Sequence, residues 1–408
     1  MRIRRGLTWV ALLAAASLVG GSVSAAAKAA SSELDAVARG SDVSVAVAAR
    51  GRTLYEHSAD QLRTPASVQK VLLSMALFDE LGPAHRIKTR ASSNKSSGAI
   101  GNLWVAGGGD PSMVSGWGDS THTGVGRLAN RIRRAGIKRV GGAVVVDSSS
   151  FANDWNAPGW QPWSRDFANR PTALAIDGNG MPNPPLALGA SLTYALESRG
   201  IQVDGRARSG RVPARARVVT RVRSAPLRTL VTHMNVTSSN FYAEMLGKLL
   251  GARTFEGPGT MSKGARAIEQ LAARRGVDLI AHDSSGLSYA NRVSAGGLVT
   301  LLEHARRQPW GRALRLSLPG PGQGTLAARL EGLGLHAKTG TLWNGASALV
   351  GWVRLRHVGT AEFAILSRNS SKSTEDAIVQ GIAAGLKAPE DRADAPPKVD
   401  TRCHLSHR

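Results

Sequence analysis

Hydrophobic positions along the chain alternate between the period of a strand and that of a helix. Within residues 42–49, valines at every second position predict a strand, and a second short strand around Leu54 would complete a hairpin. Residues 65–81 differ, because Pro65 precedes an almost continuous apolar run that stops at Gly82 and Pro83. Proline at the start and Gly-Pro at the end are typical helix boundaries. An apolar surface on nearly all sides predicts that this helix is buried inside a domain.

The remaining apolar segments predict helices and strands throughout the chain. Helices are expected at 125–135, 186–199, 226–234, 241–250, 294–306 and 374–386, and strands at 103–105, 140–146, 335–343, 347–355 and 361–366. Asn344-Gly345 lies between two of the C-terminal strands and predicts a hairpin turn. The two N-terminal strands and the three C-terminal strands would then form one mixed sheet that carries helices.

A change of composition divides the chain into domains. From about Lys88 the sequence becomes rich in serine, asparagine and glycine, which indicates the start of an inserted second domain. We expect one domain formed by 33–87 together with 225–388, and an inserted domain at 88–224. Residues 389–408 are rich in proline and charge and are predicted to be disordered. A chain of 408 residues is long enough for two domains.

The N-terminus predicts export. Three arginines within residues 2–5 precede an apolar stretch, and small residues follow, which is the order found in a secretory signal peptide. We assign the signal peptide to 1–27 and expect a secreted protein of the cell wall or periplasm. The alternative is an uncleaved N-terminal membrane anchor, for which the apolar run is marginally long. The single cysteine, Cys403, lies in the polar tail and provides neither an intrachain disulfide nor a cysteine-based metal site.

The net charge restricts the partners. A formal charge of +23 suits an anionic environment, such as nucleic acid, a membrane surface or an anionic cell-wall polymer. The basic residues are scattered and form no nucleic-acid-binding module, so nucleic acid is not expected. Anionic cell-wall polymers remain candidate partners.

Three short motifs carry the candidate chemistry. Ser67-x-x-Lys70 opens the buried helix, Ser238-x-Asn240 lies between two predicted helices, and Lys338-Thr339-Gly340-Thr341 lies on a predicted strand. Each motif is weak alone, as Ser92-Ser93-Asn94-Lys95 matches two of the patterns without an apolar helix behind it. Their order and predicted secondary structure make the combination specific.

The residue types suit an activated serine. Ser67 and Lys70 share one helix face, so a neutral lysine could accept the serine proton; burial and a second cation, Lys338, would lower the pKa of Lys70. Ser238 could relay protons, and Asn240 could orient the lysine and a substrate amide. The Lys338 charge and the hydroxyls of Thr339 and Thr341 suit a substrate carboxylate. The backbone N–H groups of Ser67 and Thr341 could form an oxyanion hole.

This motif set resembles that of penicillin-binding proteins and class A β-lactamases. The chain is most similar to the D-alanyl-D-alanine carboxypeptidase/endopeptidase family, the class C low-molecular-mass penicillin-binding proteins. Further matching patterns lie at 103–111 (LWVAGGGDP), 240–246 (NFYAEML), 283–288, 291–294, 318–320 and 324–326.

The resemblance implies an α+β fold, in which a penicillin-binding/serine β-lactamase-like domain has an antiparallel sheet of about five strands flanked by helices and carries an inserted α/β domain. The implied activity is that of a serine-type D-Ala-D-Ala carboxypeptidase, with endopeptidase action on cross-links as an additional option. The implied partners are peptidoglycan stem peptides as substrates and β-lactams as inhibitors that acylate Ser67. No cofactor and no metal are expected.

Three positions depart from the family pattern. Ser239 stands where aspartate is common, at the variable position of its motif. Only a short linker separates residues 177–179 from Pro184, so a third small domain is expected to be absent or vestigial. Tyr289 stands where many members carry arginine, which changes the expected recognition of the stem peptide.

Two other functions fit the same motifs. A β-lactamase is disfavoured because the long separation of Ser67 from Ser238 implies an inserted domain that compact β-lactamases lack. A non-catalytic cell-wall-binding protein is disfavoured because all three motifs are intact. Trp155, Trp160 and Trp163 are interpreted as packing residues, with a glycan or peptide groove as the alternative.

Overall fold

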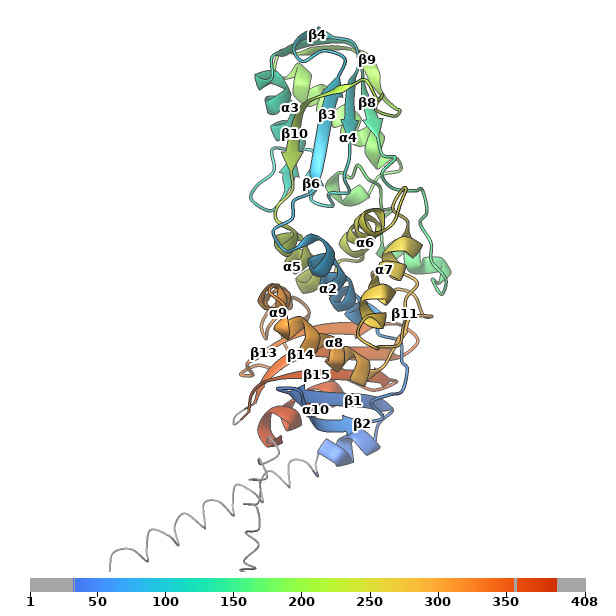
Figure 1. The fold of residues 1–408 in the computed structure, drawn as a ribbon, viewed down its shortest axis with the longest axis vertical. Coiled ribbons are helices and arrows are strands. Elements are labelled where there is room, and N and C mark those ends of the chain that lie inside the picture. Colours follow the sequence, from blue (N-terminus) through green and yellow to red (C-terminus); the bar gives the residue numbers. More distant parts are fainter. Residues whose placement is uncertain (1–31, 33, 356–357, 387–408) are drawn as a thin grey trace, which may run out of the picture.

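The computed structural model describes residues 32, 34–355 and 358–386. The predicted signal peptide at 1–27 and the predicted disordered tail at 389–408, with Cys403, lie outside the described residues. Two sheets lie at opposite ends of an elongated molecule, and helices occupy the region between them (Figure 1).

The lower sheet in Figure 1 combines the two ends of the described chain. Its order is β13-β14-β15-β1-β2, and every pairing is antiparallel. The predicted antiparallel sheet of five strands is therefore confirmed, whereas the mixed sheet expected from hydrophobic periodicity is wrong. Periodicity places residues on a face but does not give the direction of a neighbouring strand. The strands are β1 (Val43–Ala49), β2 (Arg52–His57), β13 (Leu335–Thr341), β14 (Ala346–Leu355) and β15 (Gly359–Arg368).

Both faces of this sheet are covered, as the alternation of its residues requires. Val43, Val45 and Val47 share a buried cluster with α10 (Lys372–Gly385) and with Leu34 of the helical residues 34–39. The alternate residues of β1 face a second cluster, formed with the central helices.

The central helices surround α2 (Gln69–Leu81), which a single 3₁₀ turn, η1 (Ala66–Val68), precedes. Residues 69–78 are all buried, which confirms the predicted buried helix. The helices around it are α5 (Leu227–Thr237), α6 (Asn240–Thr254), α7 (Met261–Ala273), α8 (Ala295–Arg307) and α9 (Gly311–Ser317).

The upper sheet in Figure 1 belongs to the inserted segment. Its order is β10-β3-β5-β8-β4, with β9 also paired to β8, and it contains both parallel and antiparallel pairs. One buried apolar cluster, drawn only from residues between Ala91 and Val222, joins this sheet to its helices. The elements are β3 (Lys88–Ser93), β4 (Gly98–Ile100), β5 (Leu103–Ala106), β8 (Ile137–Asp147), β9 (Gln202–Ser209), β10 (Arg217–Arg223), α3 (Val125–Arg134) and α4 (Pro184–Glu197).

Short strands and 3₁₀ helices connect the larger elements. Residues 180–183 alone connect η3 to α4, at the place where a further small domain was expected to be absent or vestigial. The short elements are β6 (Met113–Val114), β7 (Thr123–Gly124), β11 (Leu279–Ile280), β12 (Arg292–Val293), η2 (Pro162–Phe167), η3 (Asp177–Asn179) and η4 (Gly324–Leu326).

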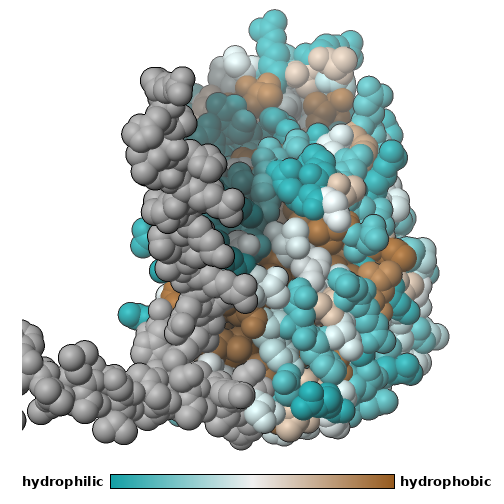
Figure 2. Space-filling view, turned by 60° about the horizontal axis from the view of Figure 1, so that its bottom comes forward, coloured by the Kyte–Doolittle hydropathy of each residue, from teal (hydrophilic) through white to brown (hydrophobic). Residues whose placement is uncertain are grey.

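Polar side chains predominate on one face of the molecule. The face shown in Figure 2 is largely hydrophilic, with hydrophobic residues in small separate groups. Within the described ranges, none of the helices combines the length and the apolar character needed to cross a bilayer.

Candidate active site

The structure brings the three motifs together where η1, the α5–α6 junction and β13 meet. Lys70 Nζ lies 3.0 Å from Ser67 Oγ and donates to Asn240 Oδ1 at 2.7 Å. Lys338 Nζ donates to Ser238 Oγ at 2.9 Å. Ser238 is the C-cap residue of α5 and Asn240 is the first residue of α6, so one junction supplies both side chains.

Ser239, between these two residues, does not join the cluster. Its hydroxyl caps α6 by accepting a hydrogen bond from the N–H of Tyr242 at 3.2 Å. A serine at this position therefore serves the helix rather than the chemistry, which agrees with its position being variable.

The backbone at the site adopts uncommon conformations. Ala66 and Ser238 have positive φ values of 49° and 55°, in the left-handed region that residues other than glycine seldom occupy. The turn that carries Ser67 is also tightly enclosed. A Cβ atom added to Gly286 would lie 1.9 Å from the carbonyl oxygen of Ala66, and one added to Gly340 would lie 2.8 Å from that of Pro65. Glycine is therefore required at both positions so that the neighbouring backbones can approach Ser67.

The hydrogen bonds of Lys70 determine which way its amine points. Besides Ser67, Lys70 Nζ contacts Asn240 Oδ1 at 2.7 Å and the carbonyl oxygen of Ser285 at 2.6 Å. Both of these oxygens only accept, so they take two N–H groups of the amine. In the neutral amine the remaining direction is a lone pair, and it points at Ser67 Oγ.

Burial makes the neutral amine accessible near neutral pH. Lys70 is fully buried, and burial lowers its pKa to about 7, although the charges of Asp283 and Glu244 act in the opposite direction. Lys338 is also fully buried, and its pKa is lowered well below its ordinary value by burial and by the charge of Lys70. It contacts Ser238 Oγ and, at 2.8 Å, the carbonyl oxygen of Thr339.

Two buried acids hold the segment behind Lys70, and sequence reasoning gave neither a role. Asp283 accepts hydrogen bonds from the N–H groups of Gly286 at 3.0 Å and Ser288 at 2.7 Å. Glu244 Oε1 accepts from the N–H of Ser285 at 2.8 Å, so it fixes the residue whose carbonyl binds Lys70. Burial raises the pKa of Glu244 to about 8. In the sequence, Glu244 could have been noticed as an acidic residue inside the otherwise largely apolar segment 241–250.

A pocket of about 130 Å³ opens at Ser67. Trp163 belongs to its wall, so the groove alternative holds for this residue better than a role in packing. Trp160, in contrast, donates to Asp283 Oδ2 at 2.8 Å behind the site. The pocket is lined by Ser67, Trp163, Ser164, Phe167, Asn240, Gly286, Leu287, Tyr289, Thr341, Leu342 and Trp343.

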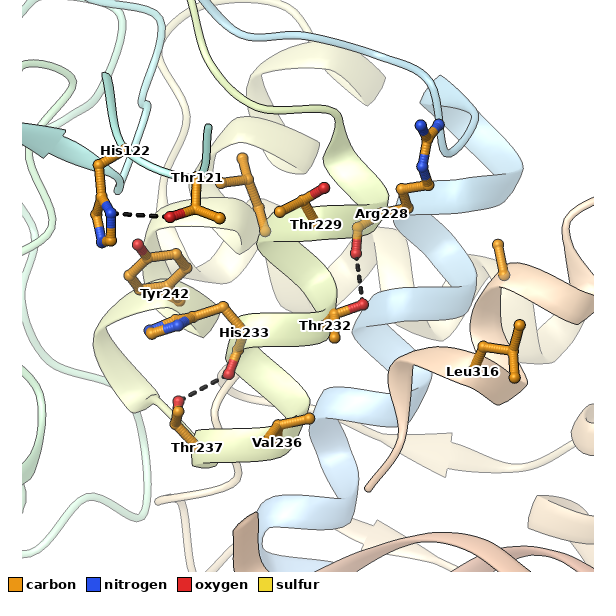
Figure 3. Close-up of a pocket in the computed structure, with 12 residues that line it drawn as sticks. Thr121, His122, Arg228, Thr229, Thr232, His233, Val236, Thr237, Tyr242 and Leu316 are labelled. Carbon is orange, nitrogen blue, oxygen red and sulfur yellow. Dashed lines mark hydrogen bonds between the residues drawn. The ribbon is translucent and has the colours of Figure 1, made fainter. Parts of the chain in front are cut away.

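A larger hollow, of about 530 Å³, lies on the outer face of α5 and contains no residue of the three motifs. Figure 3 shows His233 and Tyr242 side by side, with Thr121 and His122 of the inserted segment above them. We assign the predicted chemistry to the smaller pocket because Ser67, the predicted nucleophile, lines it. Among the residues that the structure describes, no group of three or more histidine, cysteine, aspartate or glutamate side chains could hold a metal ion.

Comparisons with known proteins identify the family of the chain. The profile of the D-Ala-D-Ala carboxypeptidase 3 (S13) family matches residues 25–184 and 180–388. A D-alanyl-D-alanine carboxypeptidase of Actinomadura sp. (strain R39) is 26% identical over 454 aligned residues, which cover 86% of this chain and 82% of the relative. Carboxypeptidase DacB of Mycolicibacterium smegmatis is 28% identical, over 83% of this chain and 78% of the relative.

The fold also matches a solved structure. The crystal structure of penicillin binding protein 4 (dacB) from Haemophilus influenzae superposes with a TM-score of 0.73 at 20% identity. The match covers 86% of this chain and 98% of that structure. The predicted fold class is therefore confirmed.

Proposed function

The chain belongs to the D-Ala-D-Ala carboxypeptidase 3 (S13) family, and we propose that Ser67 is the nucleophile with which it releases terminal D-alanine from peptidoglycan stem peptides. Family membership makes the chain a peptide hydrolase, a serine-type D-Ala-D-Ala carboxypeptidase. One observation carries the assignment of the residues: the buried Lys70 amine lies 3.0 Å from Ser67 Oγ and has two other contacts, both to acceptors.

Acylation begins with transfer of the Ser67 hydroxyl proton to neutral Lys70. Ser67 Oγ attacks the carbonyl carbon of the penultimate D-alanine, and the carbonyl oxygen becomes an oxyanion. The backbone N–H groups of Ser67 and Thr341 stabilise that charge, and a donor of this kind contributes about 2.7–4 kcal/mol. Asn240 holds Lys70 in place and directs its N–H groups away from the serine.

Lys338, Thr339 and Thr341 bind the terminal carboxylate of the substrate. A carboxylate near Lys338 restores the charge that burial disfavours, so substrate and lysine stabilise each other's ionised forms. Ser238 Oγ accepts a hydrogen bond from Lys338 Nζ. Ser238 gives its hydroxyl proton to the departing amine of D-alanine, and the Lys70 ammonium reprotonates Ser238 and becomes neutral again. Water then attacks the acyl-enzyme, Lys70 accepts a water proton, and Ser67 leaves with its hydroxyl restored.

Penicillin labelling and D-alanine release test the assignment. Wild-type chain should form a stable covalent adduct with a fluorescent penicillin and should release D-alanine from a stem pentapeptide. Ser67→Ala should do neither, while Ser92→Ala, on β3 at the start of the unrelated sequence 92–95, should do both. Full labelling of Ser67→Ala would overturn the assignment.

The same assay separates the related activities. A cross-linked stem-peptide dimer measures endopeptidase action beside carboxypeptidase action. Rapid turnover of penicillin, in place of a persistent adduct, would indicate a β-lactamase. Binding of peptidoglycan without any release of D-alanine would indicate a non-catalytic wall-binding protein.

We place this activity outside the cytoplasm, on the basis of the predicted signal peptide at 1–27 and of a substrate found in the cell wall. The formal charge of +23 includes three arginines of the predicted signal peptide, and the strongly basic remainder supports retention on anionic wall polymers. Sedimentation with purified walls at low and high salt tests this idea, because screening should release the chain.

We further treat 88–224 as a separate inserted domain, because its buried cluster lies wholly within that segment.

A further inference from the structure

Three aromatic side chains form an exposed group beside Ser67. The Trp163 and Trp343 rings are stacked with centroids 5.8 Å apart, and Phe167 meets Trp343 edge-on at 5.5 Å. Their exposed fractions are 40%, 72% and 48% for Trp163, Trp343 and Phe167 respectively. We call these three residues the aromatic wall. Large exposed rings gathered at a pocket are typical of a surface that a ligand covers.

The wall lies on one side of the nucleophile. The pocket that it lines reaches Ser67, Asn240 and Thr341 but neither Ser238 nor Lys338. Because Lys338 and Ser238 face the leaving D-alanine in the proposed reaction, we place the pocket on the acyl side of the scissile bond, with Thr341 at the border between the two sides. A substrate group in it belongs to the acyl part of the peptide, the part that stays on Ser67.

The chemistry of the pocket discriminates against one kind of acyl side chain. None of the eleven lining residues carries a charged side chain. A carboxylate placed there would lose hydration and gain no cationic partner. The faces of aromatic rings also carry partial negative charge, which favours alkyl groups and cations over anions.

We propose that the aromatic wall binds the acyl-side side chain of the substrate and selects an aliphatic stem without a carboxylate. Trp343 makes the largest contribution, because it contacts both other rings and is the most exposed of them. The inference rests on the proposed function, since it takes Ser67 as the nucleophile. It adds the class of stem peptide that the pocket accepts, in which the side chain of the residue before D-Ala-D-Ala ends in an amine or carries no charge.

A series of peptides tests the selection. N-acetyl-X-D-Ala-D-Ala is supplied with X as norleucine, lysine, 2-aminoadipate or glycine, and kcat/KM for D-alanine release is measured. Norleucine and lysine should exceed aminoadipate by on the order of tenfold to a hundredfold. Equal or better cleavage of the aminoadipate peptide would overturn the proposal.

Variants of the wall locate the effect. Trp343→Ala should lower kcat/KM for the norleucine peptide by roughly fivefold to tenfold, and should leave the glycine peptide almost unchanged. A structural defect would lower both equally and would contradict the proposal. Tyr194→Ala is the matched control, because Tyr194 is a ring of 74% exposure on α4, within the inserted segment.

A third variant adds the missing charge. Tyr289→Arg places a cation on the pocket lining, so the aminoadipate peptide should gain relative to norleucine. Fluorescent penicillin labelling of each variant separates the two levels of inference. If penicillin does not label Ser67 in the wild-type chain, the proposed function is refuted. If labelling is normal but the enzyme does not discriminate among the peptides, only the role of the aromatic wall is refuted.

Discussion

Replacing Asn240 with aspartate would test whether Lys70 is the base. The side-chain oxygen of Asn240 lies 2.7 Å from Lys70 Nζ, so Asn240→Asp places a negative charge against the amine with almost no change of shape. The carboxylate stabilises the ammonium form and therefore raises the pKa of Lys70. A base acts only when neutral, so the variant should need a higher pH to react.

The size of the shift follows from Coulomb's law. Two unit charges about 4 Å apart interact by about 4 kcal/mol at an effective dielectric constant of about 20, which corresponds to about three pKa units. The pKa of Lys70 would then move from about 7 to about 10. At pH 7 the neutral fraction would fall from about one half to about one in a thousand, so acylation should slow by a factor of about 500.

The assay is the second-order rate constant for acylation by a fluorescent penicillin between pH 6 and pH 10. The wild-type rate should rise through pH 7, and the Asn240→Asp rate should recover about tenfold per pH unit up to about pH 10. Asn130→Asp, on α3, changes the net charge equally and should keep the wild-type profile. A slow Asn240→Asp variant whose profile still rises near pH 7 would refute the role of Lys70.

Two other predictions concern the support of the site. Gly286→Ala should slow acylation by on the order of a hundredfold, because the new Cβ atom would displace the turn that carries Ser67. The control is Gly276→Ala, where φ is also positive but no atom lies within 4 Å of the added Cβ, and this variant should change stability only. Equal acylation rates for the two variants would contradict the argument. Glu244→Gln should make thermal stability depend less on pH. The native pKa of Glu244, about 8, exceeds its ordinary 4.5, so the native state binds more protons in that window and wild-type stability falls as the pH rises through it. Melting temperatures at pH 5 and pH 8 check this, and an unchanged difference would count against it.

The sequence could predict those parts of the fold whose signals are local. Pro65 and Gly82 bound the buried helix, and both signals act within one turn of the chain. The helix α7 was not predicted, although its buried residues Ala265, Ile268 and Ala272 recur at the spacing of one helix face. The antiparallel direction of β15 beside β1 depends on how distant segments meet, which periodicity does not encode.

The candidate site likewise has parts that the sequence could predict and parts that depend on the tertiary fold. Ser67, Lys70, Ser238, Asn240 and Lys338 could be proposed from residue type and spacing. The structure places them in two hydrogen-bonded groups, Lys70 with Ser67 and Asn240, and Lys338 with Ser238. The stacking of Trp163 on Trp343 could not be predicted, because Trp163 lies within the inserted segment 88–224 and Trp343 lies far along the chain, after β13. The turn at Asn344-Gly345 was predicted, but its consequence, a ring held against η2, depends on tertiary packing.

In the proposed reaction, the two buried lysines link substrate binding to the activation of Ser67. Asp283 and Glu244 support a charge on Lys70, whereas the contacts of Lys338 are a hydroxyl and a carbonyl, so the pKa of Lys338 falls well below its ordinary value. A substrate carboxylate supplies the negative charge that Lys338 lacks and favours its ammonium form. Because two interacting groups titrate as a pair, the charge gained by Lys338 lowers the pKa of Lys70. In the proposed reaction, binding of a terminal carboxylate therefore favours the ammonium form of Lys338 and the neutral form of Lys70, which increases the fraction of molecules in which Ser67 is activated.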